Sequence, residues 1–235
     1  MRRCGLLLGI LASLAGSAVA SAVPVGTLDV AGLGTARVSA NAVDFGPFTS
    51  AKGNFVVTGG EYSFSTVPLG SQGVITDLFF NTTPPGPPIP PALAPFLLQV
   101  PVPGTTFVLD LRQITLGGGP PCTVPPGVGA SCSPTEHLPS TPYLLTQTPT
   151  GVVVSFSVNG VVFDQRDQSS MPYKGLFTMN LTRSSEDTIP KIFGWWAVGT
   201  YVESSWSAEF TVVPEPGTAA LLGFGLLALA LRRAR

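Results

Sequence analysis

Residues 152–163 read Val-Val-Val-Ser-Phe-Ser-Val-Asn-Gly-Val-Val-Phe, and this stretch decides the fold class. Both sides of Asn159-Gly160 are rich in β-branched and aromatic residues, which pack well on the pleated surface of a sheet. Asn-Gly is also the preferred pair for a two-residue type I′ turn. The stretch therefore predicts a β-hairpin, with strands at 152–158 and 161–163.

Period-two alternation recurs on both sides of this stretch, whereas helical periodicity is hard to find. In residues 107–112, Phe107, Leu109 and Leu111 are expected to face the core, with Asp110 and Arg112 toward water. A second hairpin is expected around Gly59-Gly60, between strands at 54–58 and 61–65. Further strands are expected at 26–30, 36–43, 73–80, 143–147, 174–181, 194–198 and 207–212.

Short strands at close spacing, with no helix expected between them, favour an all-β fold. An antiparallel β-sandwich or jelly roll fits this pattern best. A β-helix is the alternative, but no short repeat of fixed length is found. The 27 glycines and 24 prolines suit many turns, and the hydrophobic content of 44% argues against disorder.

The N-terminus has the pattern of a secretory signal peptide. Met1-Arg2-Arg3 precedes an apolar run at 6–12, and Ala18-Val19-Ala20 supplies the small residues that a signal peptidase reads. Residues 1–20 are therefore predicted to be a signal peptide, with cleavage after Ala20 or, as the alternative, after Ala22. The Sec translocon and signal peptidase are the expected partners at this step.

Cleavage would remove Cys4 and leave Cys122 and Cys132, which most simply form a disulfide in an exported chain. So short a loop predicts a stabilisation of roughly 2–3 kcal/mol. His137 is the only histidine, and there is no Cys-x-x-Cys, so no metal site and no cofactor are expected.

The C-terminus combines three features: Pro214-Glu215-Pro216, an uncharged apolar run at 218–231, and the basic residues Arg232, Arg233 and Arg235. A helix that is apolar on every side belongs in a membrane or a large core, and the arginines favour the cytoplasmic side. The run is shorter than the roughly 20 residues that comfortably span a bilayer. A plain tail anchor therefore remains an alternative to a processed signal.

This tail resembles the PEP-CTERM sorting signal, and the resemblance implies recognition and cutting by a membrane-embedded exosortase-like enzyme. The chain then divides into a signal peptide (1–20), a β-sandwich ectodomain (21–213) and a sorting signal (214–235). Within the sorting signal, the resemblance makes Pro214, Glu215 and Pro216 the recognition site. The body also resembles, more diffusely, the β-rich ectodomains found upstream of such tails.

Catalysis is not expected. No Gly-x-Ser-x-Gly elbow is present, and His137 lies in a Pro/Ser-rich loop. Asp164 with Asp167, or Glu186 with Asp187, could in principle form a glycosidase pair, but carboxylates in such hydrophilic stretches are usually just solvated. Calcium binding by residues 164–168 is left open.

Aromatic residues gather in the last third of the chain: Tyr173, Trp195, Trp196, Tyr201 and Trp206. Packing in the core is the favoured interpretation. If Trp195 and Trp196 lie in one strand they point to opposite sides, so one of them could stack on a sugar ring.

Charge restricts the possible partners. Without the terminal signals, the body keeps 7 basic and 12 acidic residues, a net charge of about −5, so nucleic-acid binding is not expected. The leading hypothesis is a non-catalytic exported protein, and the resemblance implies a Gram-negative bacterium in which it is held transiently at the inner membrane and then placed at the cell surface or in the extracellular matrix. A role with exopolysaccharide or biofilm follows from it. The alternatives are a carbohydrate-binding module or adhesin and, third, a secreted hydrolase.

Overall fold

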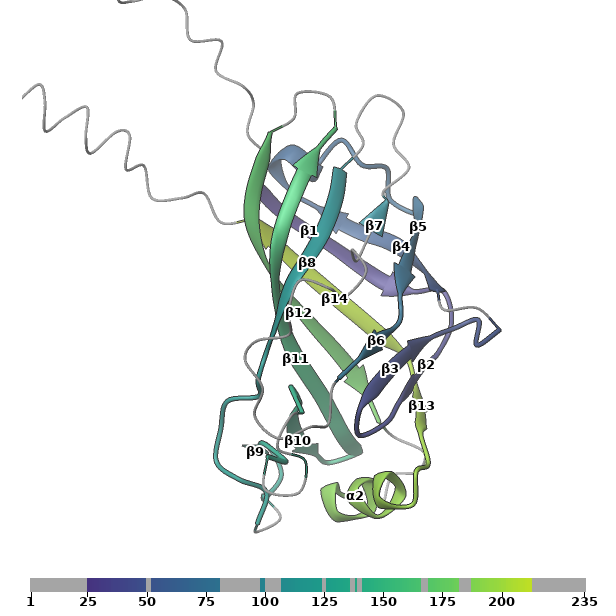
Figure 1. Ribbon diagram of the computed structural model, residues 1–235, viewed down its shortest axis with the longest axis vertical. Coiled ribbons are helices and arrows are strands. Elements are labelled where there is room, and N and C mark those ends of the chain that lie inside the picture. Colours follow the sequence, from purple (N-terminus) through teal and green to yellow (C-terminus); the bar gives the residue numbers. More distant parts are fainter. Residues whose placement is uncertain are drawn as a thin grey trace, which may run out of the picture.

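The computed structural model describes two antiparallel β-sheets, one α-helix and one 3-10 turn (Figure 1). The residues described are 25–49, 52–80, 98–99, 107–123, 126–135, 138, 141–165, 169–181 and 187–212. The larger sheet contains, in spatial order, β12 (Ser170–Asn180), β14 (Trp206–Val212), β1 (Gly26–Gly32), β4 (Lys52–Gly60), β5 (Gln72–Thr76), β7 (Leu98–Gln99), β8 (Phe107–Thr115), β11 (Gly151–Asp164), β10 (Leu144–Thr148) and β9 (Ser131–Cys132). The smaller sheet contains β13 (Val202–Ser204), β2 (Ala36–Val38), β3 (Ala42–Phe45) and β6 (Leu78–Phe79). The prediction of an all-β, antiparallel fold is confirmed.

The larger sheet closes on itself, because β12 pairs with β11 as well as with β14. Its inner face is lined by alternate residues of each strand, and neighbouring aromatic rings meet there. The rings of Phe156 and Phe177 stack with centroids 4.8 Å apart, and Phe177 meets Phe210 edge-on at 5.7 Å. Burial of these large apolar side chains is the main source of stability for such a sheet.

The smaller sheet packs against the inner face of the larger one. Phe45 on β3 is fully buried, and its ring centroid lies 4.7 Å from that of Trp206 on β14. Phe45 also lies 6.1 Å from Phe177 on β12. The two sheets thus share one hydrophobic core, as the sandwich prediction requires.

The hairpin predicted at Asn159-Gly160 is wrong. Strand β11 runs without a turn from Gly151 to Asp164, and this pair forms an irregularity where the register with β8 shifts. A Cβ at Gly160 would collide with the main-chain oxygen of Asp110 and with the ring of Tyr173. Glycine is therefore needed here for close approach of β8 and β12, and not for a turn.

The Gly59-Gly60 hairpin is also wrong, because both glycines belong to β4. The chain turns two residues later, in the 3-10 turn η1 (Tyr62–Phe64), where the sequence pattern had predicted a strand. Gly60 allows the main chain of Phe64 to fold back closely against β4.

Residues expected to form a strand at 194–198 lie instead in α2 (Ile189–Ala197) and just beyond it. Ile189, Ile192 and Trp196 are its buried residues, and their spacing places them on one helical face. Pro190 stands at the start of the helix, where the missing N–H costs nothing. Among the described residues, no helix is long and apolar enough to cross a membrane.

Two other expected strands are each divided. The segment 36–43 forms β2 and β3, which pair with each other across a turn at 39–41. The segment 73–80 forms β5 and β6, which belong to different sheets. Asp77 stands at this division, and its Oδ1 accepts a hydrogen bond from the main-chain N–H of Phe45 at 2.9 Å. Burial raises the pKa of the Asp77 carboxyl above its usual value.

Candidate functional site

The predicted sorting residues, Pro214 to Pro216 and the arginines at 232, 233 and 235, lie outside the described residues, as does the signal peptide 1–20. The strand that leads to them, β14, lies inside the sheet between β12 and β1 and pairs with both. Its residues alternate between buried and outward-facing positions up to Val212. The last described strand therefore ends just before the sorting residues begin.

Both ends of the described body lie side by side. Gly26, at the start of β1, is the register partner of Val212, at the end of β14. On the other side of β14, Val212 pairs with Tyr173. We call this end of the molecule, defined by Val25, Gly26 and Val212, the terminal pole. Helix α2 and strand β9 lie at the opposite end in Figure 1, which we call the distal pole.

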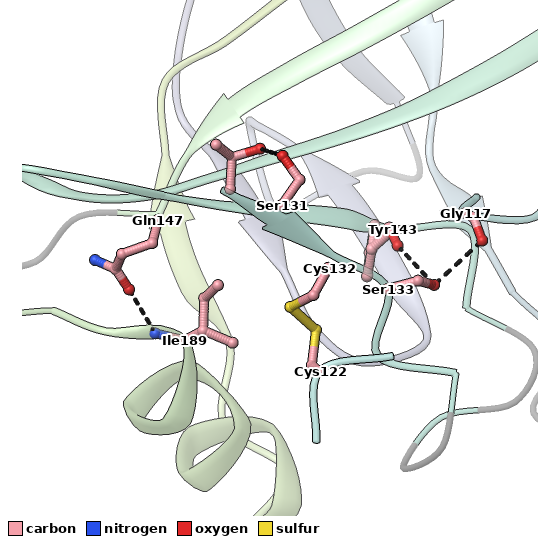
Figure 2. Close-up of a disulfide and its surroundings, with 9 residues drawn as sticks. Gly117, Cys122, Ser131, Cys132, Ser133, Tyr143, Gln147 and Ile189 are labelled. Atoms are coloured by element: carbon pink, nitrogen blue, oxygen red, sulfur yellow. Dashed lines mark hydrogen bonds between the residues drawn. A yellow bond between two sulfur atoms is a disulfide. The ribbon is translucent and has the colours of Figure 1, made fainter. Parts of the chain in front are cut away.

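A disulfide joins Cys122 and Cys132 at the distal pole, with the two Cα atoms 5.0 Å apart (Figure 2). Both cysteines are buried. The main-chain N–H of Cys122 donates to the oxygen of Ser133 at 3.1 Å, and Ser133 Oγ donates to Gly117 O at 3.2 Å. These contacts hold the loop that precedes β9 against the end of the larger sheet.

Gln147 on β10 connects this region to α2. Its Nε2 donates to the main-chain oxygens of Gly151 at 3.0 Å and Asp187 at 3.2 Å. Its Oε1 accepts from the N–H of Ile189 at 3.2 Å, which satisfies one of the unpaired donors at the helix start (Figure 2). The sequence analysis did not single out Gln147, because nothing in residues 143–148 shows that a helix starts near it.

The two tryptophans proposed for glycan stacking have different environments. Trp196 is only 6% exposed, and its Nε1 donates to the main-chain oxygen of Val38 at 3.2 Å. Its ring also lies 5.3 Å from that of Tyr143. Trp196 therefore belongs to the core and presents no ring to a ligand. Trp195 is half-buried, and in a helix the two side chains do not point to opposite sides as they would in a strand.

An aromatic and charged cluster, which the sequence analysis also missed, covers the outer face of the smaller sheet. The guanidinium carbon of Arg37 lies 3.7 Å from the ring centroid of Phe48 and 4.3 Å from that of Tyr201. Arg37 Nε donates to Glu203 Oε1 at 3.1 Å. Because these residues are widely separated in the sequence, no local spacing could have linked them. The contacts fix β13 on β2, with each cation–π pair contributing about 0.5–1 kcal/mol at such an exposed site.

Each candidate acidic pair has one member outside the described residues, Asp167 in one pair and Glu186 in the other, so the structure does not test either pair. Asp164 ends β11, whereas Asp187 lies beside Gly151 through their shared partner Gln147. The length of β11 separates the two described carboxylates, which belong to different candidate pairs, by roughly 40 Å. Asp167, Glu186 and His137 lie outside the described residues. Within the described part of the chain, no three His, Cys, Asp or Glu side chains are grouped as metal ligands would be.

Comparison with known proteins identifies the tail. Residues 212–234 match the PEP-CTERM protein-sorting motif, and the matched segment includes Pro214 to Pro216 and begins at the last residue of β14. No curated protein and no solved structure matches the chain. The motif implies export, transient membrane anchoring and exosortase processing before display at the cell surface. The chain therefore carries a PEP-CTERM protein-sorting motif directly after a β-rich body.

Proposed function

We propose that the protein is a non-catalytic component of the cell surface or extracellular matrix, associated with exopolysaccharide or biofilm in a Gram-negative bacterium. Sec delivers it, signal peptidase removes residues 1–20, and an exosortase-like enzyme recognises Pro214, Glu215 and Pro216. The arginines at 232, 233 and 235 hold the tail in the inner membrane until that step.

The observation that carries this proposal is the junction between β14 and the sorting motif. Val212 is paired on both sides, with Gly26 and with Tyr173, before the Pro-Glu-Pro residues begin. Proline cannot extend a strand ladder, so the motif also marks where pairing must stop. Removal of the chain beyond the motif would leave all described strand pairs intact. No described strand pair involves a residue beyond Val212, as a cleavable signal requires.

The test is the intact mass of the protein recovered from the envelope and the medium of its native host. We expect loss of about 20 N-terminal residues, as for a typical signal peptide, and of the segment beyond the Pro-Glu-Pro residues. A variant with Pro214, Glu215 and Pro216 all changed to alanine should keep its tail. The matched control is Glu209→Gln, which removes a carboxylate from the exposed face of β14 and should be processed normally. Retention of the C-terminal arginines in the unaltered protein would make the tail a simple anchor and would refute sorting.

A carbohydrate-binding or adhesive role is the second candidate, and it now depends on Trp195. Trp195 is partly exposed on α2 at the distal pole, whereas Trp196 is buried. A partly exposed indole can still stack on a sugar ring. We expect Trp195→Ala to weaken binding to the host's own exopolysaccharide in a co-sedimentation assay, with some loss of thermal stability because the ring also packs against the core. Unchanged binding would remove the one described tryptophan that supports this role.

A further inference from the structure

The terminal pole carries an exposed aromatic side chain in a strained turn. Tyr62 is 74% exposed, and its φ of 53° lies in the left-handed region that side chains other than glycine rarely adopt. Leu69, in the same connection between β4 and β5, is 72% exposed. Large apolar side chains this exposed contribute nothing to the core. Strain at such a position is a reason to look for a function.

The turn that carries Tyr62 is bound directly to the first residues of β1. Ser63 N–H donates to the oxygen of Val25 at 3.0 Å, and Val25 N–H donates to Ser63 Oγ at 3.0 Å. Glu61 N–H donates to the oxygen of Thr27, also at 3.0 Å. Since Gly26 in turn pairs with Val212, the turn lies beside the point where the chain continues toward the sorting motif.

The short segment 213–217, between Val212 and the apolar run of the tail, limits how far the terminal pole can lie from a membrane. The apolar run that the tail inserts begins at residue 218, only a few residues beyond Val212. Even a fully extended chain of that length reaches only about 20 Å. The headgroup layer itself occupies roughly 6 Å of that distance. While the tail is anchored, the terminal pole is therefore held within a short distance of the lipid headgroups.

The geometry points to the terminal pole as a lipid-facing surface, on which Tyr62 and Leu69 contact the headgroup layer while the tail is in the membrane. This inference rests on the membrane anchoring in the proposed function. Tyrosine favours the membrane–water interface because its ring is apolar and its hydroxyl remains hydrated. Glu61 is exposed beside Tyr62, and the body is acidic, so the contact does not depend on anionic lipid.

The test uses the protein purified with its tail intact, from an expression host that lacks an exosortase, and reconstituted into phosphatidylcholine vesicles. One variant is Tyr62→Trp; its matched control is Val198→Trp, 76% exposed just after α2 at the distal pole. Both retain the same native tryptophans. Lipids brominated near the headgroup should quench most of the added emission of Tyr62→Trp and little of that of Val198→Trp. Leu69→Trp is the second reporter if Tyr62→Trp does not fold.

The possible outcomes distinguish failure of the lipid-facing surface from failure of the membrane anchoring on which it rests. If the protein floats with the vesicles but the Tyr62 and Leu69 reporters are quenched no more than Val198→Trp, anchoring stands and the lipid-facing surface is refuted. If the protein does not float with the vesicles, the anchoring itself fails, and the inference fails with it. Unquenched reporters together with slower processing of Tyr62→Ala by an exosortase would show that this surface contacts the enzyme and not the bilayer.

Discussion

Two buried tyrosines should respond in opposite ways to removal of the hydroxyl group. Tyr143 is fully buried, and its hydroxyl lies within hydrogen-bonding distance of the main-chain oxygens of Ser39, at 3.0 Å, and Ala42, at 3.2 Å. Tyr173 is 1% exposed, and its hydroxyl has no hydrogen-bond partner among the described residues. The pair thus separates the value of a buried hydrogen bond from the cost of a buried, unpaired hydroxyl.

Tyr143→Phe removes a hydrogen bond between the larger sheet and the β2–β3 turn, and we expect it to lower the free energy of unfolding by about 1–2 kcal/mol. Tyr173→Phe removes an unpaired hydroxyl and should be neutral or stabilise by up to about 1 kcal/mol. A difference of roughly 2 kcal/mol corresponds to about 4–8 °C in melting temperature for a body of this size. Thermal and urea unfolding at neutral pH measure this difference in stability between the two variants. An equal loss in both variants would show that the Tyr173 hydroxyl is paired and would refute the reasoning.

The same two residues predict a loss of stability at alkaline pH. Burial raises the pKa of both Tyr143 and Tyr173, so the folded state retains phenolic protons that the unfolded state releases near pH 10. Their contribution is therefore fully present below about pH 10 and falls as the pH rises toward the folded pKa values. Between its unfolded and folded pKa values, each tyrosine makes the free energy of unfolding fall by about 1.4 kcal/mol per pH unit. Each Phe variant should remove one of these two contributions to the pH dependence. Urea unfolding between pH 9 and 12 tests this; a flat profile would contradict the burial of both hydroxyls.

Two further substitutions test local packing, and one pair tests the disulfide. Gly160→Ala places a methyl group against the main-chain oxygen of Asp110 and should lower the free energy of unfolding by more than about 2 kcal/mol. Gly194→Ala, on α2, adds a methyl group with no atom within 4 Å and should raise the free energy of unfolding by about 0.5–1 kcal/mol. Thermal unfolding measures both changes, and the opposite order would contradict the register of β11. Replacing Cys122 and Cys132 together by serine should cost about 2–3 kcal/mol in urea unfolding, because the unfolded loop is no longer restrained. Reduced but otherwise unaltered protein should show the same loss, and no loss in either would mean that the loop was not constrained.

The sequence predicted the strand content better than it predicted the turns. Hydrophobic alternation is a property of each strand's own residues, so β8, β12 and β14 were located with small errors in their ends. Asn159-Gly160 has the composition of a hairpin turn, but β11 continues through it because both β8 and β12 pair across that point. Tertiary pairing overrode local turn preference there, and one sequence alone does not contain that information.

Helix α2 was missed because its apolar spacing spans little more than two turns and contains the aromatic residues that also favour strands. Ile189, Ile192 and Trp196 bury one face, but the pattern begins only after the hydrophilic segment at 182–188. The error altered the site as well as the fold, since the strand assignment made Trp195 and Trp196 equal candidates for exposure. The sorting motif was recognised, in contrast, because an enzyme reads it as a short linear segment with its own composition.

The two terminal signals require a body that stays folded without them, and the antiparallel pairing of β1 with β14 suits this requirement. A body that loses a segment at each end keeps its structure only if neither segment contributes to its pairing. Gly26 and Val212 pair with each other inside the sheet, so the first and last described strands hold each other in place. The same pairing places both ends of the described body at one pole, whereas α2 and the disulfide lie at the other (Figure 1). Whatever the mature protein binds outside the cell is therefore expected at the distal pole, where Trp195 lies, and not where the tail was held.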